Sequence, residues 1–276
     1  MRQDGLIDAV PYTGRTRVSF LIGSPIAQVL APGRMTSLMR RAGRDAILVP
    51  LEVRPEQLAA TFETLKAAPN VAAILVTLPH KTPVARLCDR LSPAAAFLDA
   101  VNAARRSADG TWEGDNFDGA GMVAAIARKR RIAGARVHVI GAGAAATSIA
   151  AAMLQAGAAR LSFNDPQPAA EARLAAILHK GFGPRAVAAP VDAARAADIV
   201  INASHCGLHD GDSLPVAAEH LNGGQLVADV ITDPLDTPLL LNARAKGCVT
   251  VTGGDMLDGQ LRLLADFADG AAPMRG

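Results

Sequence analysis

Short apolar runs alternate with amphipathic stretches along most of the chain, and this alternation predicts strands followed by helices. Three early runs have the length and apolar content of buried strands: residues 18–23, 46–49 and 71–76. Helical patterns follow each of them: residues 35–42, 55–67 and 83–91. The last of these has Thr82 as its expected N-cap and Pro83 in its first turn. Strands and helices in this order predict a mostly parallel sheet.

The pattern loosens at residues 100–118, where short strands and a turn at residues 108–110 are expected before a helix over residues 118–134. A second series of buried strands then begins: residues 136–140, 160–164, 198–202 and 225–229. The last elements expected are a helix over residues 237–246, a strand over 249–252 and a helix over 255–267. The whole order fits an α/β fold with two domains joined by a short connection.

Composition and charge narrow the classes of function. Half of the residues are hydrophobic but only 3% are aromatic, which disfavours the aromatic stacking platforms that single-stranded nucleic acids require. The net charge of +2 is close to neutral. Two basic clusters, residues 105–106 and 128–131, are interpreted as solvated helix ends or phosphate contacts rather than as a nucleic-acid or membrane surface. We therefore expect a small-molecule partner and neither nucleic acid nor membrane.

The cysteines and the N-terminus indicate the compartment. Cys88, Cys206 and Cys248 are widely spaced and odd in number, which favours a reducing environment without disulfides. None of them belongs to a CxxC pair, so no metal site is expected. Residues 1–14 lack the basic and apolar regions of a signal peptide, and the apolar stretch at residues 141–159 is too rich in Ala and Gly for a membrane span. The cytoplasm is the expected location.

A glycine-rich turn follows the strand at residues 136–140 and predicts a dinucleotide site. The motif G-x-G-x-x-A places Gly141 at the tight turn, Gly143 where a pyrophosphate approaches, and Ala146 where the helix packs on the strand. Asp165 ends the next strand nineteen residues after Ala146 (165 − 146), close to the ~20 expected of the acid that binds the ribose. The alternative is a purely steric turn, with Asp165 capping the helix that follows Pro166.

The carboxylate of Asp165 also bears on the choice of cofactor. It can accept hydrogen bonds from both ribose hydroxyls but repels a 2′-phosphate, and no arginine immediately follows it. The sequence therefore favours NAD over NADP.

Polar residues lie at strand ends in the first half of the chain. Thr77 and Lys81 follow the strand at residues 71–76, at the edge where open α/β sheets bind ligands. Further polar segments occur at Asn102, at Asp118 and at Gln260. Together with the glycine-rich turn and the opening segment at residues 21–27, these motifs stand in an order that resembles the shikimate/quinate dehydrogenase family over nearly the full chain.

This resemblance implies roles for specific residues. Lys81 and Asp118 correspond to the catalytic lysine and aspartate of the family, and Thr77, Asn102 and Gln260 to residues that hydrogen-bond substrate hydroxyls. Oxidation of a secondary alcohol sends a hydride to the nicotinamide while a base such as lysine takes the hydroxyl proton. The cofactor-binding residues expected from the motif and the resemblance are Gly141, Gly143, Ala144, Ala145, Asn164, Asp165, Asn202, Ala203, Ser204 and Gly253.

The chain departs from the family at the site for the substrate carboxylate. Val29 and Ala31 replace the two serines of the family motif, Leu75 replaces an asparagine, and Ile231 is expected where the family has a tyrosine. A carboxylate without its hydrogen-bond donors is poorly held. Replacement donors are available nearby in sequence: Arg34, Thr36 and Ser37. A different hydroxylated ring or a related polyol acid is therefore expected as substrate, with weak turnover of shikimate.

The resemblance also implies a domain organisation. A substrate domain covers residues 1–117 and is rejoined by the C-terminal helix at residues 256–276, while a Rossmann dinucleotide-binding domain covers residues 118–255. Two rival interpretations stay open: a two-domain methylene-folate dehydrogenase, and a dinucleotide-binding sensor or regulatory protein that has lost catalysis. A homodimer also stays open.

Overall fold

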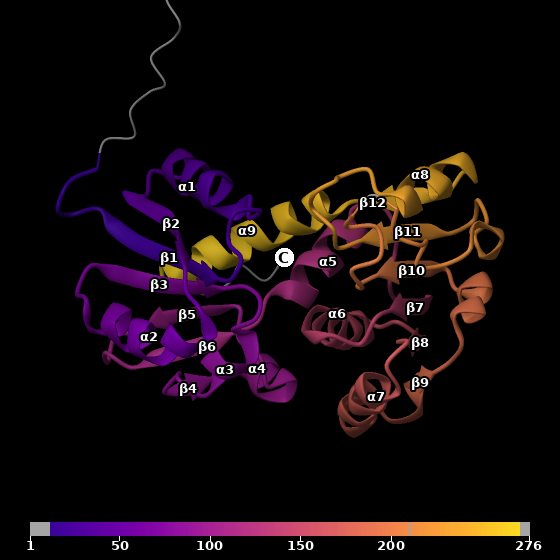
Figure 1. Cartoon of the computed structure of the whole chain (residues 1–276), viewed down its shortest axis with the longest axis horizontal. Coiled ribbons are helices and arrows are strands. Elements are labelled where there is room, and N and C mark those ends of the chain that lie inside the picture. The colour runs from indigo at the N-terminus through magenta and orange to yellow at the C-terminus, as the bar shows by residue number, and fades with distance from the viewer. Residues whose placement is uncertain (1–11, 210, 271–276) are drawn as a thin grey trace, which may run out of the picture.

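The computed structural model describes residues 12–209 and 211–270, so the residues 1–11 considered for a signal peptide lie outside it. Two α/β domains lie next to each other, each with its own sheet (Figure 1). The first sheet has the strand order β2 (Ala46–Glu52), β1 (Arg17–Gly23), β3 (Val71–Val76), β5 (Ala103–Arg106), β6 (Trp112–Asp115) and β4 (Arg90–Leu91). Strands β1, β2 and β3 are parallel, as predicted, whereas β5 is antiparallel to both of its neighbours.

The second sheet is parallel throughout. Its strand order is β12 (Val249–Val251), β11 (Leu226–Asp229), β10 (Ile199–Asn202), β7 (Arg136–Ile140), β8 (Arg160–Asn164) and β9 (Ala186–Ala188). Counted within this domain, the order is 6-5-4-1-2-3, the doubly wound order of a Rossmann fold. The order reverses between β7 and β10, and such a switch point opens a crevice for ligands at the carboxyl ends of the strands.

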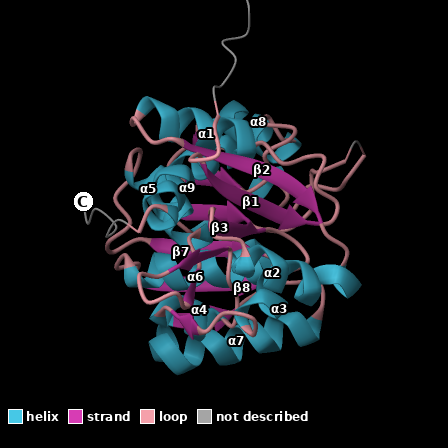
Figure 2. Cartoon of the chain, turned by 90° about the vertical axis from the view of Figure 1, so that its left-hand side faces the viewer, coloured by secondary structure: helices cyan, strands magenta, loops and turns pink. Residues whose placement is uncertain are grey.

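Helices cover the sheets and join the domains (Figure 2). They are α1 (Ala31–Arg41), α2 (Leu58–Ala67), α3 (Lys81–Ala85), α4 (Pro93–Leu98), α5 (Asp118–Ala127), α6 (Ala144–Gln155), α7 (Pro168–Phe182), α8 (Pro238–Ala245) and α9 (Gly253–Ala268). Short 3-10 helices lie at Pro55–Gln57, Gly183–Arg185, Val191–Ala196 and Ala218–His220. Helices α5 and α9 pack side by side between the two sheets. No helix in the described ranges is long and apolar enough to cross a membrane.

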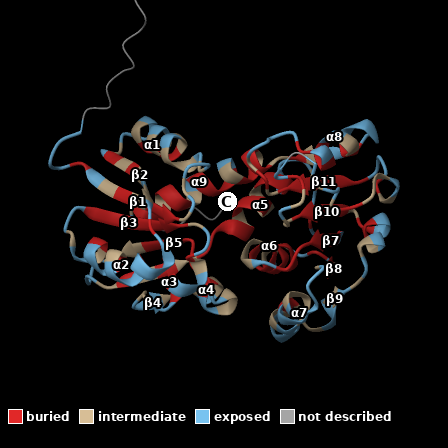
Figure 3. Ribbon diagram, viewed as in Figure 1, coloured by how far each residue is buried: buried red, intermediate tan, exposed pale blue. Residues whose placement is uncertain are grey.

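Helix α9 links the two hydrophobic cores, as the predicted return of the C-terminal helix requires. Near its start Met256 packs into the Rossmann core, and further along Leu261, Leu264 and Phe267 pack into the core under the first sheet. Burying one such side chain contributes about 1.5–3 kcal/mol. The buried residues follow the strands and the inner faces of α5 and α9 (Figure 3).

Two predicted helices differ from the structure. The helix expected over residues 83–91 ends at Ala85, because the chain then pairs with β6 as strand β4. Its N-cap is His80 rather than Thr82, without a side-chain cap. The helix expected over residues 118–134 ends at Ala127. A helix after Pro166 was considered only as the alternative role for Asp165, and the length of α7 was not predicted.

Candidate active site

A carboxylate at the junction of the two domains collects three hydrogen bonds. Asp118 is buried at the first position of α5. Its Oδ2 accepts from Lys81 Nζ at 2.6 Å, and its Oδ1 accepts from Asn102 Nδ2 at 2.8 Å and from Gln260 Nε2 at 3.0 Å. Four separate parts of the chain therefore meet at one group.

The lysine and the aspartate form an ion pair that water reaches poorly. The side chains of Lys81 and Asp118 are only 13% and 7% exposed. Asp118 lies in the first turn of α5, where the positive end of the helix dipole favours a carboxylate. An ammonium carries three N–H donors, and Asp118 engages one of them. Lys81 therefore keeps donors for a ligand oxygen while Asp118 fixes its direction.

The two amides beside Asp118 differ in what they leave for a ligand. Asn102 is held on both sides, since its Oδ1 also accepts from the backbone N–H of Phe117 at 2.9 Å. It was predicted to bind substrate, and besides holding Asp118 it lines the cavity described below. Gln260 has no second partner among the described residues, so its Oε1 is available to a hydroxyl group.

A cavity of about 260 Å³ opens beside this cluster. All five residues predicted for catalysis and substrate binding line it: Thr77, Lys81, Asn102, Asp118 and Gln260. Its lining also includes the apolar side chains of Val29, Ala31 and Leu75, three positions at which the chain departs from the family motif. Within the described part of the chain, Lys81 is the one cation that lines it, and that cation is already paired.

The expected replacement donors do not reach this cavity. The hydroxyl of Thr36 accepts from the backbone N–H of Leu48, and neither Arg34 nor Ser37 lines the cavity. Both belong to helix α1 but lie in a groove on its other side, where Arg34 pairs with Asp258 at 3.1 Å. The hypothesis that these residues hold a substrate carboxylate is therefore wrong for this structure.

The structure also shows where Ile231 lies, the residue expected at the family's tyrosine position. Ile231 is buried and does not line the cavity, whereas the next residue, Thr232, does. Of these two residues, Thr232 is therefore the one whose position can affect a ligand in the cavity.

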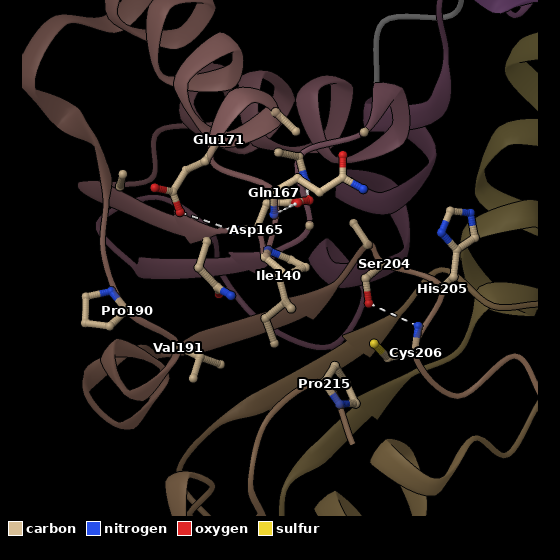
Figure 4. Close-up of a pocket in the computed structure, with 18 of the residues that line it drawn as sticks. Ile140, Asp165, Gln167, Glu171, Pro190, Val191, Ser204, His205, Cys206 and Pro215 are labelled. Carbon is tan, nitrogen blue, oxygen red and sulfur yellow. Dashed lines mark hydrogen bonds between the residues drawn. The ribbon is translucent and has the colours of Figure 1, made fainter. Parts of the chain in front are cut away.

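A larger cavity of about 960 Å³ lies at the carboxyl ends of β7, β8 and β10, where the strand order reverses (Figure 4). The glycine-rich turn forms its floor. Gly141 has φ +108°, and a Cβ there would meet the Ala203 carbonyl oxygen at 2.8 Å, so only glycine fits. Around the Cβ position of Gly143 there is open space, and helix α6 begins there without a side-chain cap. Its first N–H groups are therefore free to bind an anionic group.

Asp165 lines this cavity, but both of its carboxylate oxygens already accept hydrogen bonds from backbone N–H groups. Its Oδ2 accepts from the backbone N–H of Ala142 at 2.7 Å, and its Oδ1 accepts from that of Gln167 at 2.8 Å. A second carboxylate, Glu171, accepts from the backbone N–H of Asp165 at 3.2 Å (Figure 4). This end of the cavity thus holds two carboxylates, together with Arg173.

A buried histidine, His138, orients the side chain of Asn164. His138 contacts Asn164 Oδ1 through Nε2 at 3.0 Å and Ser162 Oγ through Nδ1 at 2.8 Å. Burial lowers the pKa of His138, against the opposing effects of the Asn164 hydrogen bond and the charge of Asp192. A neutral ring with its proton on Nε2 donates to Asn164 and accepts from Ser162. The Asn164 amide nitrogen then faces away from the histidine.

The ten predicted cofactor residues fall into three groups. Six line the large cavity: Gly141, Gly143, Asn164, Asp165, Ala203 and Ser204. Two line the small cavity instead: Ala145 and Gly253. Neither cavity is lined by Ala144 or Asn202. Asn202 is fully buried and donates to Asp229 Oδ1 at 3.1 Å, so it shapes the loop after β10 rather than meeting a ligand.

Several lining residues were missed from the sequence. Gln167, Glu171 and Arg173 belong to the start of α7 or the loop before it, and the extent of that helix was not predicted. His205 and Cys206 follow Ser204 in the loop after β10. Because ligands bind at the carboxyl edge of such a sheet, the position of His205 and Cys206 after a predicted strand could have marked them as lining residues.

Comparison with known proteins bears on this arrangement. Residues 21–104 match the family model of the shikimate dehydrogenase substrate binding domain. A shikimate dehydrogenase (NADP(+)) of Rubrobacter xylanophilus is 36% identical over 250 residues, which cover 88% of this chain and 87% of that protein. One of Anaeromyxobacter sp. is 37% identical over 253 residues, covering 89% and 88%. The chain belongs to the shikimate dehydrogenase family.

Solved structures of this family share the whole fold with the chain. Shikimate 5-dehydrogenase of Listeria monocytogenes, in complex with shikimate and NAD, has a TM-score of 0.86 and 26% identity, covering 95% of this chain and 94% of that one. The 5-ketofructose reductase of Gluconobacter sp. has a TM-score of 0.85 and 28% identity, covering 94% and 95%. The protein is thus an oxidoreductase by family. The curated relatives are named for NADP(+), so their names do not support the predicted preference for NAD.

Proposed function

We propose that this shikimate dehydrogenase-like protein interconverts a secondary alcohol and a ketone on an uncharged, hydroxylated substrate. The observation that carries the proposal is the Lys81–Asp118 pair, held by two amides at the mouth of a small cavity. A sensor without catalysis has no need of this arrangement.

Lys81 is the proton donor in the reducing direction. A nicotinamide bound at the glycine-rich turn would supply the hydride for the carbonyl carbon. Lys81 Nζ donates a proton to the carbonyl oxygen, which becomes the hydroxyl, and oxidation reverses both transfers. Asp118 holds the lysine in position through the 2.6 Å contact. Gln260 Oε1 and the Thr77 hydroxyl line the same cavity and can accept from or donate to neighbouring hydroxyl groups.

The residues at the glycine-rich turn fit a dinucleotide. Gly143 leaves open space beside the uncapped start of α6, which suits a pyrophosphate. We infer that NAD is the preferred cofactor, because Asp165 and Glu171 place two carboxylates where a 2′-phosphate would add negative charge. The names of the relatives point to NADP(+), and Arg173 in the same cavity is the residue that would favour it.

The apolar side chains in the lining of the small cavity argue for a substrate without a carboxylate. Val29, Ala31 and Leu75 offer no side-chain donor, and Lys81 is already paired. An unpaired carboxylate there would lose its hydration without compensation. A structural neighbour named 5-ketofructose reductase, at 28% identity, indicates that this fold also accommodates an uncharged sugar ketone.

Nicotinamide absorbance on a substrate panel tests the proposal. The purified protein is mixed with NAD or NADP and with shikimate, quinate and uncharged cyclic polyols, and in the reverse direction with ketoses including 5-ketofructose. Turnover of an uncharged compound with NAD is the expected result. Efficient turnover of shikimate would contradict the substrate proposal, and a preference for NADP would contradict the cofactor proposal. Dinucleotide binding without any turnover across the panel would favour the sensor interpretation.

A further inference from the structure

A second groove, separate from both cavities described above, lies on the outer side of helices α1 and α9. It has a volume of about 550 Å³, within the roughly 300–1,000 Å³ typical of small-molecule sites. Four arginines line it: Arg34 and Arg41 from α1, Arg262 from α9, and Arg128 at the end of α5. The one acidic residue among its lining is Asp258, so the net charge of these side chains is +3.

Most of this positive charge is not neutralised by the protein. Arg34 pairs with Asp258 at 3.1 Å. Within the described part of the chain, the side chains of Arg41, Arg128 and Arg262 form no ion pair or hydrogen bond. These three side chains are exposed, so water screens their mutual repulsion, and the groove attracts an anion through its net positive charge.

Ordinary structural roles explain only part of this cluster. Arg41 and Arg128 stand at the C-terminal ends of α1 and α5, where a cation favours the helix dipole. Arg262 lies inside α9 and has no such role. The sequence neighbours of Arg128 are used differently: Lys129 pairs with Asp255 at 3.0 Å, and Arg130 donates to the Gly224 carbonyl at 2.7 Å. Arg128 alone of these three points its charge into the groove.

We propose that this groove binds a small anion that carries two or more phosphate groups. Guanidinium groups match phosphate oxygens through paired N–H donors, and three unpaired arginines exceed what a single monovalent anion neutralises. The groove's apolar lining consists of leucines such as Leu38 and Leu261, and none of the described residues that line it is aromatic. Without a surface for base stacking, recognition rests on the phosphates and not on a nucleobase.

An anion in the groove would contact helices that also line the small cavity. Helix α1 supplies Ala31 to that cavity, and α9 supplies Leu257 and Gln260. An anion that bridges Arg41 on α1, Arg262 on α9 and Arg128 on α5 ties these three helices together. Binding should therefore raise the melting temperature, since a ligand that binds only the folded state stabilises it.

Isothermal titration with inorganic pyrophosphate at constant ionic strength tests the proposal on the whole chain. The test variant is Arg128→Ala/Arg262→Ala. The matched control is Arg160→Ala/Arg195→Ala, which removes two exposed arginines that line none of the three cavities. We expect wild type and control to bind alike, and the test variant to bind at least about tenfold more weakly. Thermal melts with and without pyrophosphate give a second readout of the same difference.

The glycine-rich turn is a second place where pyrophosphate can bind, and the variants separate the two. If pyrophosphate binds only at the glycine-rich turn, wild type, test variant and control will bind it with equal affinity. That result would overturn the proposal. Equal weakening in both variants would also overturn it, because a nonspecific effect of net charge would then explain the binding. None of these residues belongs to the proposed catalytic site, so the result does not depend on the proposed reaction.

Discussion

Two sets of side chains in the lining of the small cavity, called here its polar end and its apolar end, differ in their chemistry. At one end, Lys81, Asp118 and Gln260 form a polar cluster in which each charge has a partner. At the other end, Val29 and Leu75 present only carbon atoms. Both ends belong to the same cavity of about 260 Å³, yet only the polar end keeps the family motif.

This difference separates the reaction from the substrate. The polar end handles a proton and neighbouring hydroxyl groups, which any secondary alcohol of suitable shape supplies. The apolar end meets the part of the substrate that distinguishes one family member's ligand from another. Substitutions that alter one end and leave the other unchanged therefore test whether catalysis and substrate choice are independent.

The largest effect is expected from breaking the polar end with Lys81→Ala. Without the proton donor, kcat should fall by about 10²–10⁴-fold, the usual contribution of general acid–base catalysis. Dinucleotide affinity should stay unchanged, because Lys81 lines only the small cavity. Steady-state kinetics and titration of the cofactor measure the two quantities. Lys180→Ala, which removes an exposed lysine, is the control. An unchanged kcat would remove Lys81 from the mechanism.

The next effect is expected from making the apolar end polar. Val29→Ser/Ala31→Ser restores the two hydroxyl groups of the family motif. Two donors to a carboxylate should raise kcat/KM for shikimate, relative to an uncharged substrate, by about tenfold or more. Val29→Ala is the control, since it enlarges the cavity without adding a donor. If this ratio stays the same in the double variant, the apolar end does not determine the substrate class.

A third change tests how the polar end is held in place. A Cβ at Gly121 would meet Gln260 Cγ at 2.2 Å and the Met256 carbonyl oxygen at 2.9 Å. Gly121→Ala should therefore separate α5 from α9, lower the free energy of unfolding by about 1–3 kcal/mol, and reduce kcat/KM through Gln260. Gly33→Ala is the matched control, because Gly33 is also helical and has open space around it. Urea unfolding compares them, and equal stabilities would contradict the packing argument.

The sequence predicted the α/β fold because that fold depends on local patterns, whereas the residues of the polar end were inferred from the family resemblance. Buried runs mark the parallel strands, and Lys81 follows directly after one of them. The sequence could not place Arg34, because the side of α1 that faces the cavity depends on how α9 packs against it. The same limit explains the helix expected over residues 83–91. Its second half became β4 through pairing with β6, a partner more than twenty residues away.

The smallest effect is expected at His138, which lies outside both ends of the small cavity. Burial lowers the pKa of His138, so the folded protein keeps the ring neutral while the unfolded chain takes up a proton below about pH 6.5. Its contribution to stability is therefore present above pH ~6.5 and is lost as the pH falls through the lowered pKa, by about 1.4 kcal/mol for each unit of pKa difference.

His138→Gln should flatten the fall in melting temperature between about pH 7 and pH 5, because the replacement cannot titrate. His179→Gln removes an exposed histidine and should leave the wild-type profile unchanged. The ratio of kcat/KM between charged and uncharged substrates should not change in either variant, since neither histidine lines the small cavity. A pH profile that His138→Gln leaves as steep as in the wild type would assign the acid sensitivity to other groups. A changed substrate ratio would mean that His138, which lies in the Rossmann domain, affects substrate choice in the small cavity, and the two domains would then be coupled.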